Sequence, residues 1–129
     1  MFRVLITGSR DWADYALIEH KLQKLSEMLE ERPATLVSGA CPTGADRMAE
    51  AAWSRLFGPW VATPQRLLER HPADWRTNGK SAGFIRNKEM VDLGANLCMA
   101  FSRNESRGTA HTIQLAQAAG IKTLIYRSH

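Results

Sequence analysis

Three glycine-containing loops carry residue types that bind anions in proteins. They read TGSR at 7–10, SGACPTGAD at 38–46 and SRGT at 106–109. Glycine lets backbone N–H groups approach a ligand closely, hydroxyl groups add hydrogen-bond donors, and arginine adds a charged one. Taken singly, each loop is equally typical of a tight polar turn between a strand and a helix, so the elements around the loops must decide.

Alternating apolar and amphipathic segments predict the strands and helices that position these loops. We expect strands at 2–7, 34–39, 60–63, 96–101 and 122–127, and helices at about 14–31, 44–58, 83–94 and 108–120. Residues 64–82 are predicted to form a long polar loop with a helical turn at 65–70. Short apolar strands that alternate with helices are typical of a parallel sheet. The predicted fold is α/β: a single Rossmann-like three-layer domain over residues 1–129, with a mostly parallel sheet of about five strands and helices on both faces.

The parallel sheet brings the three loops to one edge, because the carboxyl ends of all its strands lie there and ligands bind in the crevice beside them. This convergence favours an anion site over three unrelated turns. The candidate ligand-binding residues on the loops are Gly8, Ser9, Arg10, Ser38, Gly39, Gly44, Asp46, Arg107, Gly108 and Thr109. Neither a G-x-G-x-x-G fingerprint nor a Walker A motif occurs, so an ordinary NAD dehydrogenase or P-loop NTPase is disfavoured.

Five side chains at the edge of the loops or outside them have two competing interpretations or an expected position. Asp46 either caps its helix or accepts a hydrogen bond from a ribose hydroxyl. Trp75 either stacks on a base or packs beneath the long loop. Arg86 and Asn87 begin a helix, where acidic residues are the usual choice, so we expect the pair to face the crevice. His111 has the pattern of a packed or solvated histidine.

The bulk composition narrows the class of protein. The net charge of +4 permits an anionic partner. However, the sequence has no stripe of arginines that alternates with aromatic residues. Single-stranded nucleic-acid binding is therefore a minor alternative, and other nucleic-acid binding is not expected. Cys41 and Cys98 are far apart, and neither a signal-peptide pattern nor a bilayer-spanning apolar run is present. We therefore expect a cytoplasmic protein with reduced thiols and no membrane partner. The histidines show no metal-ligand spacing, so no metal is expected.

Five motifs together resemble the SLOG superfamily, most closely its YspA-type, YpsA-related branch. They are ITGSRDW, SGACPTGADRMAE, HPADW, GFIRNKEMV and SRGTAHTIQLAQAAGI. The resemblance implies a Rossmann-like fold that binds a nucleotide or a nucleotide-derived ligand, such as an ADP-ribose or a nucleoside monophosphate. It places Gly8, Ser9 and Arg10 in the first ligand loop, and Gly108 with Thr109 as the phosphate-binding pair.

The resemblance leaves two principal functions open. The first is a binding domain that senses or sequesters its ligand and requires no cofactor, as a homodimer or higher homo-oligomer; apolar helix positions such as Trp53 and Leu56 hint at an interface. The second is an enzyme similar to the Lonely-Guy phosphoribohydrolases, whose Arg-Lys-x-x-Met motif resembles RNKEM at 86–90. Those hydrolases carry a glutamate where this chain has Thr112, so Arg86 with Asp46 or Asp74 would have to supply the chemistry.

Overall fold

The computed structural model describes residues 1–57 and 65–128 of the chain. Its strands are β1 (Phe2–Gly8), β2 (Ala34–Ser38), β3 (Arg66–Arg70), β4 (Leu97–Arg103) and β5 (Lys122–Ser128). Its helices are α1 (Tyr15–Leu29), α2 (Gly44–Phe57), α3 (Trp75–Asn78), α4 (Ala82–Asp92) and α5 (Arg107–Ala118), with a short 3-10 turn, η1 (Gly79–Ser81), before α4. The strand expected at 60–63 lies outside the described residues.

The five strands form one parallel sheet in the order β3-β2-β1-β4-β5. Leu5 in β1 is paired with Val37 of β2 on one side and with Cys98 of β4 on the other. The chain builds outward from β1 to β3, then returns to place β4 on the opposite side of β1. This change of direction creates a crevice between the carboxyl ends of β1 and β4, and the predicted α/β fold with its parallel sheet is confirmed.

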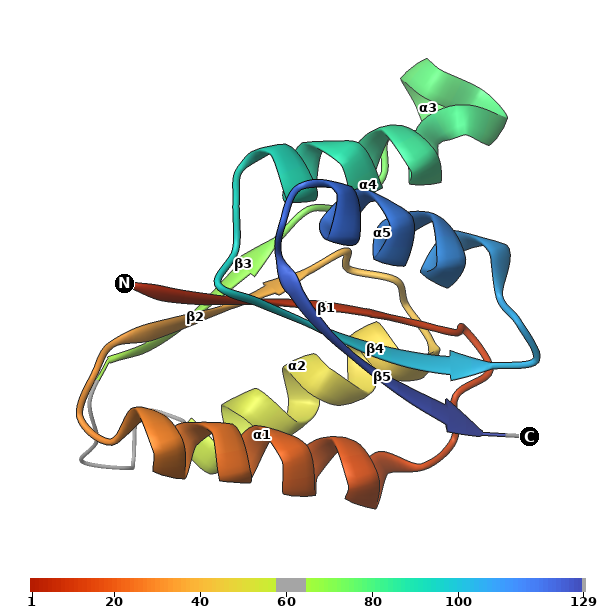
Figure 1. Cartoon of the computed structure of the whole chain (residues 1–129). Coiled ribbons are helices and arrows are strands. Elements are labelled where there is room, and N and C mark those ends of the chain that lie inside the picture. The colour runs from red at the N-terminus through yellow and green to blue at the C-terminus, as the bar shows by residue number, and fades with distance from the viewer. Residues whose placement is uncertain (58–64, 129) are drawn as a thin grey trace.

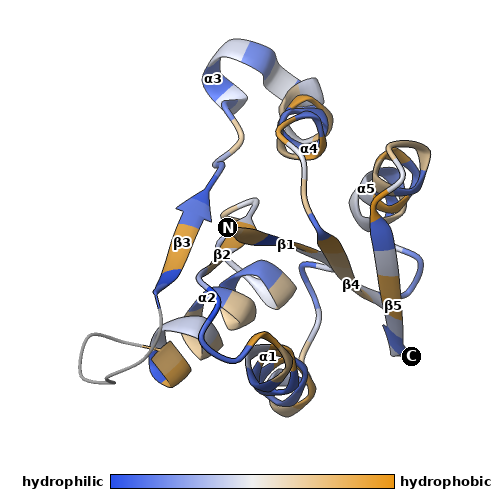
Figure 2. Ribbon diagram, turned by 60° about the vertical axis from the view of Figure 1, so that its left-hand side comes forward, coloured by the Kyte–Doolittle hydropathy of each residue, from blue (hydrophilic) through white to orange (hydrophobic). Residues whose placement is uncertain are grey.

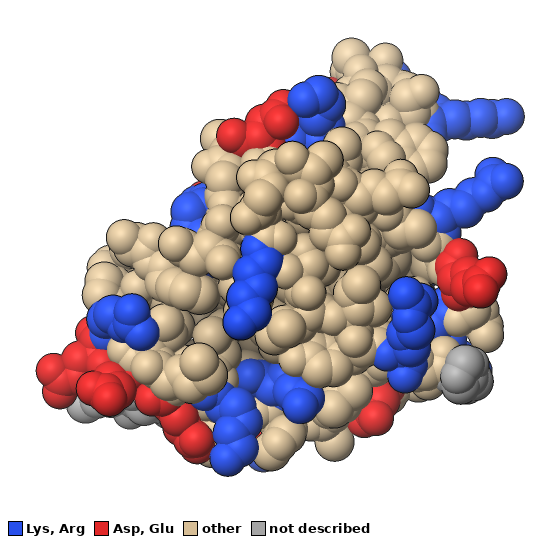
Figure 3. Space-filling model, in the orientation of Figure 1, with Lys and Arg blue, Asp and Glu red and all other residues tan. Residues whose placement is uncertain are grey.

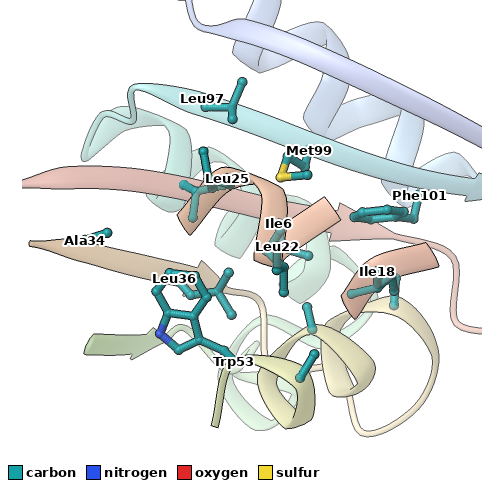
Figure 4. Close-up of a cluster of buried hydrophobic side chains, with 14 of the residues drawn as sticks. Ile6, Ile18, Leu22, Leu25, Ala34, Leu36, Trp53, Leu97, Met99 and Phe101 are labelled. Carbon is teal, nitrogen blue, oxygen red and sulfur yellow. The ribbon is translucent and has the colours of Figure 1, made fainter. Parts of the chain in front are cut away.

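Two helices cover each face of the sheet (Figures 1 and 2). The helices α1 and α2 pack on one face in a large apolar cluster that includes Ile6, Leu22, Leu36 and Phe101 (Figure 4). A smaller cluster under α4 and α5 fills the other face. The strands β2 and β4 are buried almost along their whole length, which is why they appear in the sequence as uninterrupted apolar runs.

The structure corrects the prediction of a helical turn at 65–70, because Arg66–Arg70 form the edge strand β3. This strand pairs with β2 along its whole length. Its Glu69 also forms a bidentate ion pair with Arg3, at 2.8 and 2.7 Å, which reaches across β2 from β1. Both interactions join segments distant in sequence, so they override the weak local signal.

The structure places Trp53 and Leu56, the apolar residues considered above for an interface, at the core under α2. Trp53 is only 2% exposed and its indole N–H donates to the carbonyl of Leu67 at 3.0 Å. Leu56 packs against the same apolar core. Trp53 therefore belongs to the interior, and Leu56 is partly buried against the same core. Within the described ranges 1–57 and 65–128, no helix has both the length and the apolar character needed to cross a bilayer.

Candidate functional site

A cleft of about 460 Å³ opens at the carboxyl ends of β1 and β4, on the edge of the sheet where α4 and α5 begin (Figure 1). Its walls come from the loops after β1, β2 and β4, and from α3, α4 and the first turn of α5. The crevice at the point where strand order reverses is the usual ligand position in such folds. The predicted convergence of the loops is thus present in the structure.

Close backbone packing at Gly8 and Gly44 brings the first two loops together. A Cβ atom on Gly8 would lie 2.3 Å from the Cβ of Ala45 and 2.7 Å from the carbonyl oxygen of Phe101. A Cβ on Gly44 would lie 2.2 Å from the carbonyl oxygen of Ser9, and Gly44 also has a positive φ of 73°. Only glycine fits either position, so these glycines hold β1, β4 and α2 in contact.

Ser9 links the same segments by hydrogen bonds. The hydroxyl oxygen of Ser9 accepts a hydrogen bond from the backbone N–H of Arg103 at 2.7 Å. The same hydroxyl donates to the backbone carbonyl of Arg103 at 3.0 Å. The carbonyl of Ser9 accepts from the N–H groups of Trp12 and Ala45, and its own N–H donates to the carbonyl of Phe101. Ser9 is 1% exposed, and its bonds connect the floor of the cleft into one unit.

Asp46 places a buried carboxylate at the start of α2. It is 7% exposed, and its Oδ2 accepts from the N–H of Cys41 at 3.2 Å. Burial raises the pKa of Asp46 from 3.8 to about 6, although the Cys41 N–H and the charges of Arg86 and Arg10 act in the opposite direction. The carboxyl group therefore carries a large desolvation penalty at neutral pH.

Arg86 lies beside Asp46, on the other side of Gly39. Its Nη1 donates to the carbonyl of Gly39 and its Nε donates to Oδ1 of Asn87 at 2.9 Å. A Cβ on Gly39 would lie 2.9 Å from Nη1 of Arg86 and 3.0 Å from Oδ2 of Asp46, so a side chain there would displace both. Burial lowers the pKa of the guanidinium. No ion pair joins Asp46 or Arg86 to another residue within 1–57 and 65–128.

The first turn of α5 forms the opposite wall. Ser106 caps the helix, and its hydroxyl accepts from Oγ1 of Thr109 at 3.1 Å. A Cβ on Gly108 would meet nothing within 4 Å, so the backbone there faces open space. The amide of Asn87 reaches toward the carbonyl of Gly108 and Nδ1 of His111, each at 3.4 Å. Asn87 thereby connects Arg86 with this wall.

The predicted site residues fall into two groups. Those that line the cleft are Gly8, Ser9, Arg10, Gly39, Asp46, Trp75, Arg86, Asn87, Gly108 and Thr109. Ser38, Gly44, Arg107 and Asp74 are not part of the lining. The hydroxyl of Ser38 donates to Glu50 at 2.7 Å, and the carboxylate of Asp74 caps α3 by accepting from the N–H of Thr77 at 3.1 Å. In the structure Asp74 therefore acts as the cap of α3, beside the cleft lining and outside it.

Several lining residues were not predicted: Asp11, Lys80, Phe84, Arg103, Asn104 and Ser106. Cys41, considered above without a role, also lines the cleft. Arg103 enters because β4 extends two residues beyond the expected strand, to Arg103, and its Nη1 donates to the carbonyl of Asp11 at 3.0 Å. The signal available in the sequence was the SRNES segment at 102–106, a polar stretch before a helix.

Thr112 and His111 have local roles in α5. Thr112 is 0% exposed, and its Oγ1 donates to the carbonyl of Gly108 at 3.2 Å. The position at which the hydrolases carry a glutamate is thus buried inside the helix packing. His111 packs edge to face on Phe84, with ring centroids 4.7 Å apart, as expected for a packed histidine.

Charge and potential metal ligands are dispersed over the molecule. On the face shown in Figure 3, basic side chains lie among uncharged surface and acidic groups instead of in one stripe. Within residues 1–57 and 65–128, no group of three or more His, Cys, Asp and Glu side chains is placed to hold a metal ion. The cleft, in contrast, combines a concave shape with several charged side chains from different elements.

Comparisons with known proteins match the chain to one family model and to one phage protein. The family model for "YspA, cpYpsA-related SLOG family" matches residues 2–77, which include β1, β2 and α2. The Gene 61 protein of Mycobacterium phage D29 is 42% identical over 128 residues, which is 96% of this chain and 95% of the phage protein. No solved structure matches the chain at a significant level.

Proposed function

Because the chain belongs to the YspA, cpYpsA-related SLOG family, we propose that its cleft binds a nucleotide or nucleotide-derived ligand, of the ADP-ribose or nucleoside-monophosphate type. The protein would sense or sequester this ligand and would need no cofactor. The family supports a role connected with nucleotides, and the residues of the cleft support the choice of an anionic ligand.

The observation that carries the proposal is the excess of positive charge in the cleft. Four basic side chains line it, and two acidic ones, Asp11 and Asp46, oppose them. The basic residues are Arg10, Lys80, Arg86 and Arg103. The first turn of α5 faces the same space, and a helix N-terminus favours negative charge. A phosphate or diphosphate group satisfies both features.

Asp46 suits the sugar of such a ligand. A buried carboxylate with no ion pair destabilises the fold, and such groups are concentrated at functional sites. Its Oδ2 is held by Cys41, which leaves Oδ1 to accept from a ribose hydroxyl, as acidic residues do in dinucleotide-binding folds. Arg86, beside it, retains Nη2 for a charged hydrogen bond.

The test is calorimetric titration with AMP and with ADP-ribose. Replacement Arg86→Ala removes a charge from the cleft and should weaken binding by about tenfold or more, as loss of a charged hydrogen bond does. The matched control is Arg107→Ala, which removes the same charge from an exposed position outside the lining and should change affinity little. Equal affinity of the Arg86→Ala and wild-type proteins would contradict the proposal, provided that both melt cooperatively.

A second candidate function is N-glycosidic hydrolysis of a nucleotide, favoured by the raised pKa of Asp46 near 6. A carboxyl group with that pKa can exchange a proton with water or with the leaving base near neutral pH. Arg86 would hold the phosphate. Incubation with AMP followed by chromatography tests this activity: release of free adenine that Asp46→Asn abolishes would make the protein an enzyme. An unchanged nucleotide would leave binding alone.

A further inference from the structure

Two aromatic side chains distinguish this cleft from a site for a phosphate or a sugar phosphate. Among the aromatic residues that the structure describes, Trp75 and Phe84 are the exposed ones, at 50% and 47%, and both line the cleft. The guanidinium of Arg10 lies 5.7 Å from the centroid of the Trp75 ring, a cation–π contact that orients the indole. In Figure 2, α3, which begins at Trp75, lies beyond α4, away from the sheet.

Gly83 leaves a space between Trp75 and Arg86. A Cβ on Gly83 would lie 3.6 Å from Cη2 of Trp75 and 3.8 Å from Nη2 of Arg86. Gly83 lies within α4 and does not have a positive φ, so its backbone does not require glycine. Glycine inside a helix is less favourable than alanine by about 1 kcal/mol. The missing side chain is therefore best explained by the space that it leaves.

Building on the nucleotide binding proposed above, we propose that the space at Gly83, between Trp75 and Arg86, holds the planar base of the ligand. Nucleobases stack on the faces of indole rings and on the plane of a guanidinium group. An indole and a guanidinium are the two groups that border the space. The base, rather than the phosphate, then decides which anions the cleft retains, and sugar phosphates without a base bind weakly.

The test compares AMP with ribose 5-phosphate by calorimetric titration of the full chain. Stacking on an aromatic side chain changes affinity by about tenfold to a hundredfold, so AMP should bind about tenfold or more tightly than ribose 5-phosphate. Trp75→Leu, which keeps an apolar side chain without a ring, should remove this advantage and leave the affinity for ribose 5-phosphate unchanged. Trp75→Phe should retain most of it. Ile85→Ala, a change at an exposed position of α4 outside the cleft lining, is the control.

A second variant fills the space without altering either partner. Gly83→Leu favours the helix, so its melting temperature should not fall, while its affinity for AMP should fall by about tenfold or more. Glu89→Leu, which adds the same side chain at an exposed position of α4 outside the cleft lining, should bind AMP as the wild type does.

The outcomes separate this inference from the proposal on which it rests. Equal affinities for AMP and ribose 5-phosphate, unaffected by Trp75→Leu and Gly83→Leu, would overturn the base site and leave anion binding intact. If AMP, ribose 5-phosphate and ADP-ribose all fail to bind at millimolar concentration, the nucleotide proposal and the base site are overturned together.

Discussion

Replacement of Asp46 by asparagine should make the protein more stable at neutral and alkaline pH. The folded-state pKa of about 6 lies above the ordinary value of 3.8, so the folded protein binds this proton more tightly than the unfolded chain does. Stability from this group is complete below about pH 4 and is lost as the pH rises through 6. Asparagine keeps an oxygen that accepts from the N–H of Cys41 but carries no charge.

The size of the effect follows from the same two values. Each tenfold change in a protonation equilibrium is worth about 1.4 kcal/mol, so the rise from 3.8 to about 6 corresponds to about 3 kcal/mol. Urea unfolding at pH 8 should therefore give Asp46→Asn a free energy of unfolding about 2–3 kcal/mol above that of the wild type. At pH 4 the two proteins should be nearly equal. The difference between variants removes the contributions of all other titrating groups.

The control is Asp92→Asn, which removes a carboxylate that is 61% exposed and pairs with Lys88 at 2.8 Å. A surface ion pair contributes about 0–1 kcal/mol, so this variant should show little dependence on pH. If Asp46→Asn were equally destabilised at pH 4 and pH 8, the reasoning would be refuted. Asp46 would then be a structural cap. The N-terminus of α2 would stabilise its charged carboxylate by more than burial destabilises that charge.

Three other predictions address the fold around the cleft. In the native protein Cys41 should react with a disulfide reagent at pH 8, whereas Cys98 should not, because burial raises the pKa of Cys98 to about 12. Saturating nucleotide should slow the reaction of Cys41. Modification of both thiols in the native protein would contradict the packing around Cys98. Glu69→Gln should lower the free energy of unfolding at pH 7 by about 1–2 kcal/mol. Because Arg3 holds the pKa of Glu69 near 2, this difference in urea unfolding should shrink as the pH falls from 4.5 toward 2, whereas a constant difference would point to lost packing. Gly8→Ala places a carbon 2.7 Å from a carbonyl oxygen of β4 and should lower stability by about 3 kcal/mol or more, which thermal melting would detect.

The central strands were predictable because strands buried on both faces appear in the sequence as uninterrupted apolar runs. β1, β2 and β4 are covered by helices on both faces, and their apolar runs gave bounds within two residues of the observed ones. β3 is an edge strand with exposed Leu67 and Leu68 and three charged residues. It exists through its pairing with β2 and the contact between Arg3 and Glu69, which no local pattern reveals.

The candidate site was predictable to the extent that topology alone places residues. Gly8, Gly39 and Gly108 follow from the ends of the strands and the start of a helix. The direction of individual side chains did not follow. Ser38 is in the expected loop but bonds Glu50 instead of facing the cleft, and Phe84 has the pattern of an ordinary apolar helix residue.

The hydrogen bonds of Ser9 have a consequence for the thermodynamics of recognition. Because Ser9 already joins the ends of β1 and β4 to α2, a ligand that enters the anion end finds its contacts in place. Ordering a flexible side chain on binding costs about 0.5–1.5 kcal/mol, and this end of the cleft avoids most of that loss. The α3 segment has no buried residue, so substitutions in it should change the free energy of unfolding little. On the proposals above, substitutions in α3 would change the preference for the base and leave the anion end of the cleft unaltered.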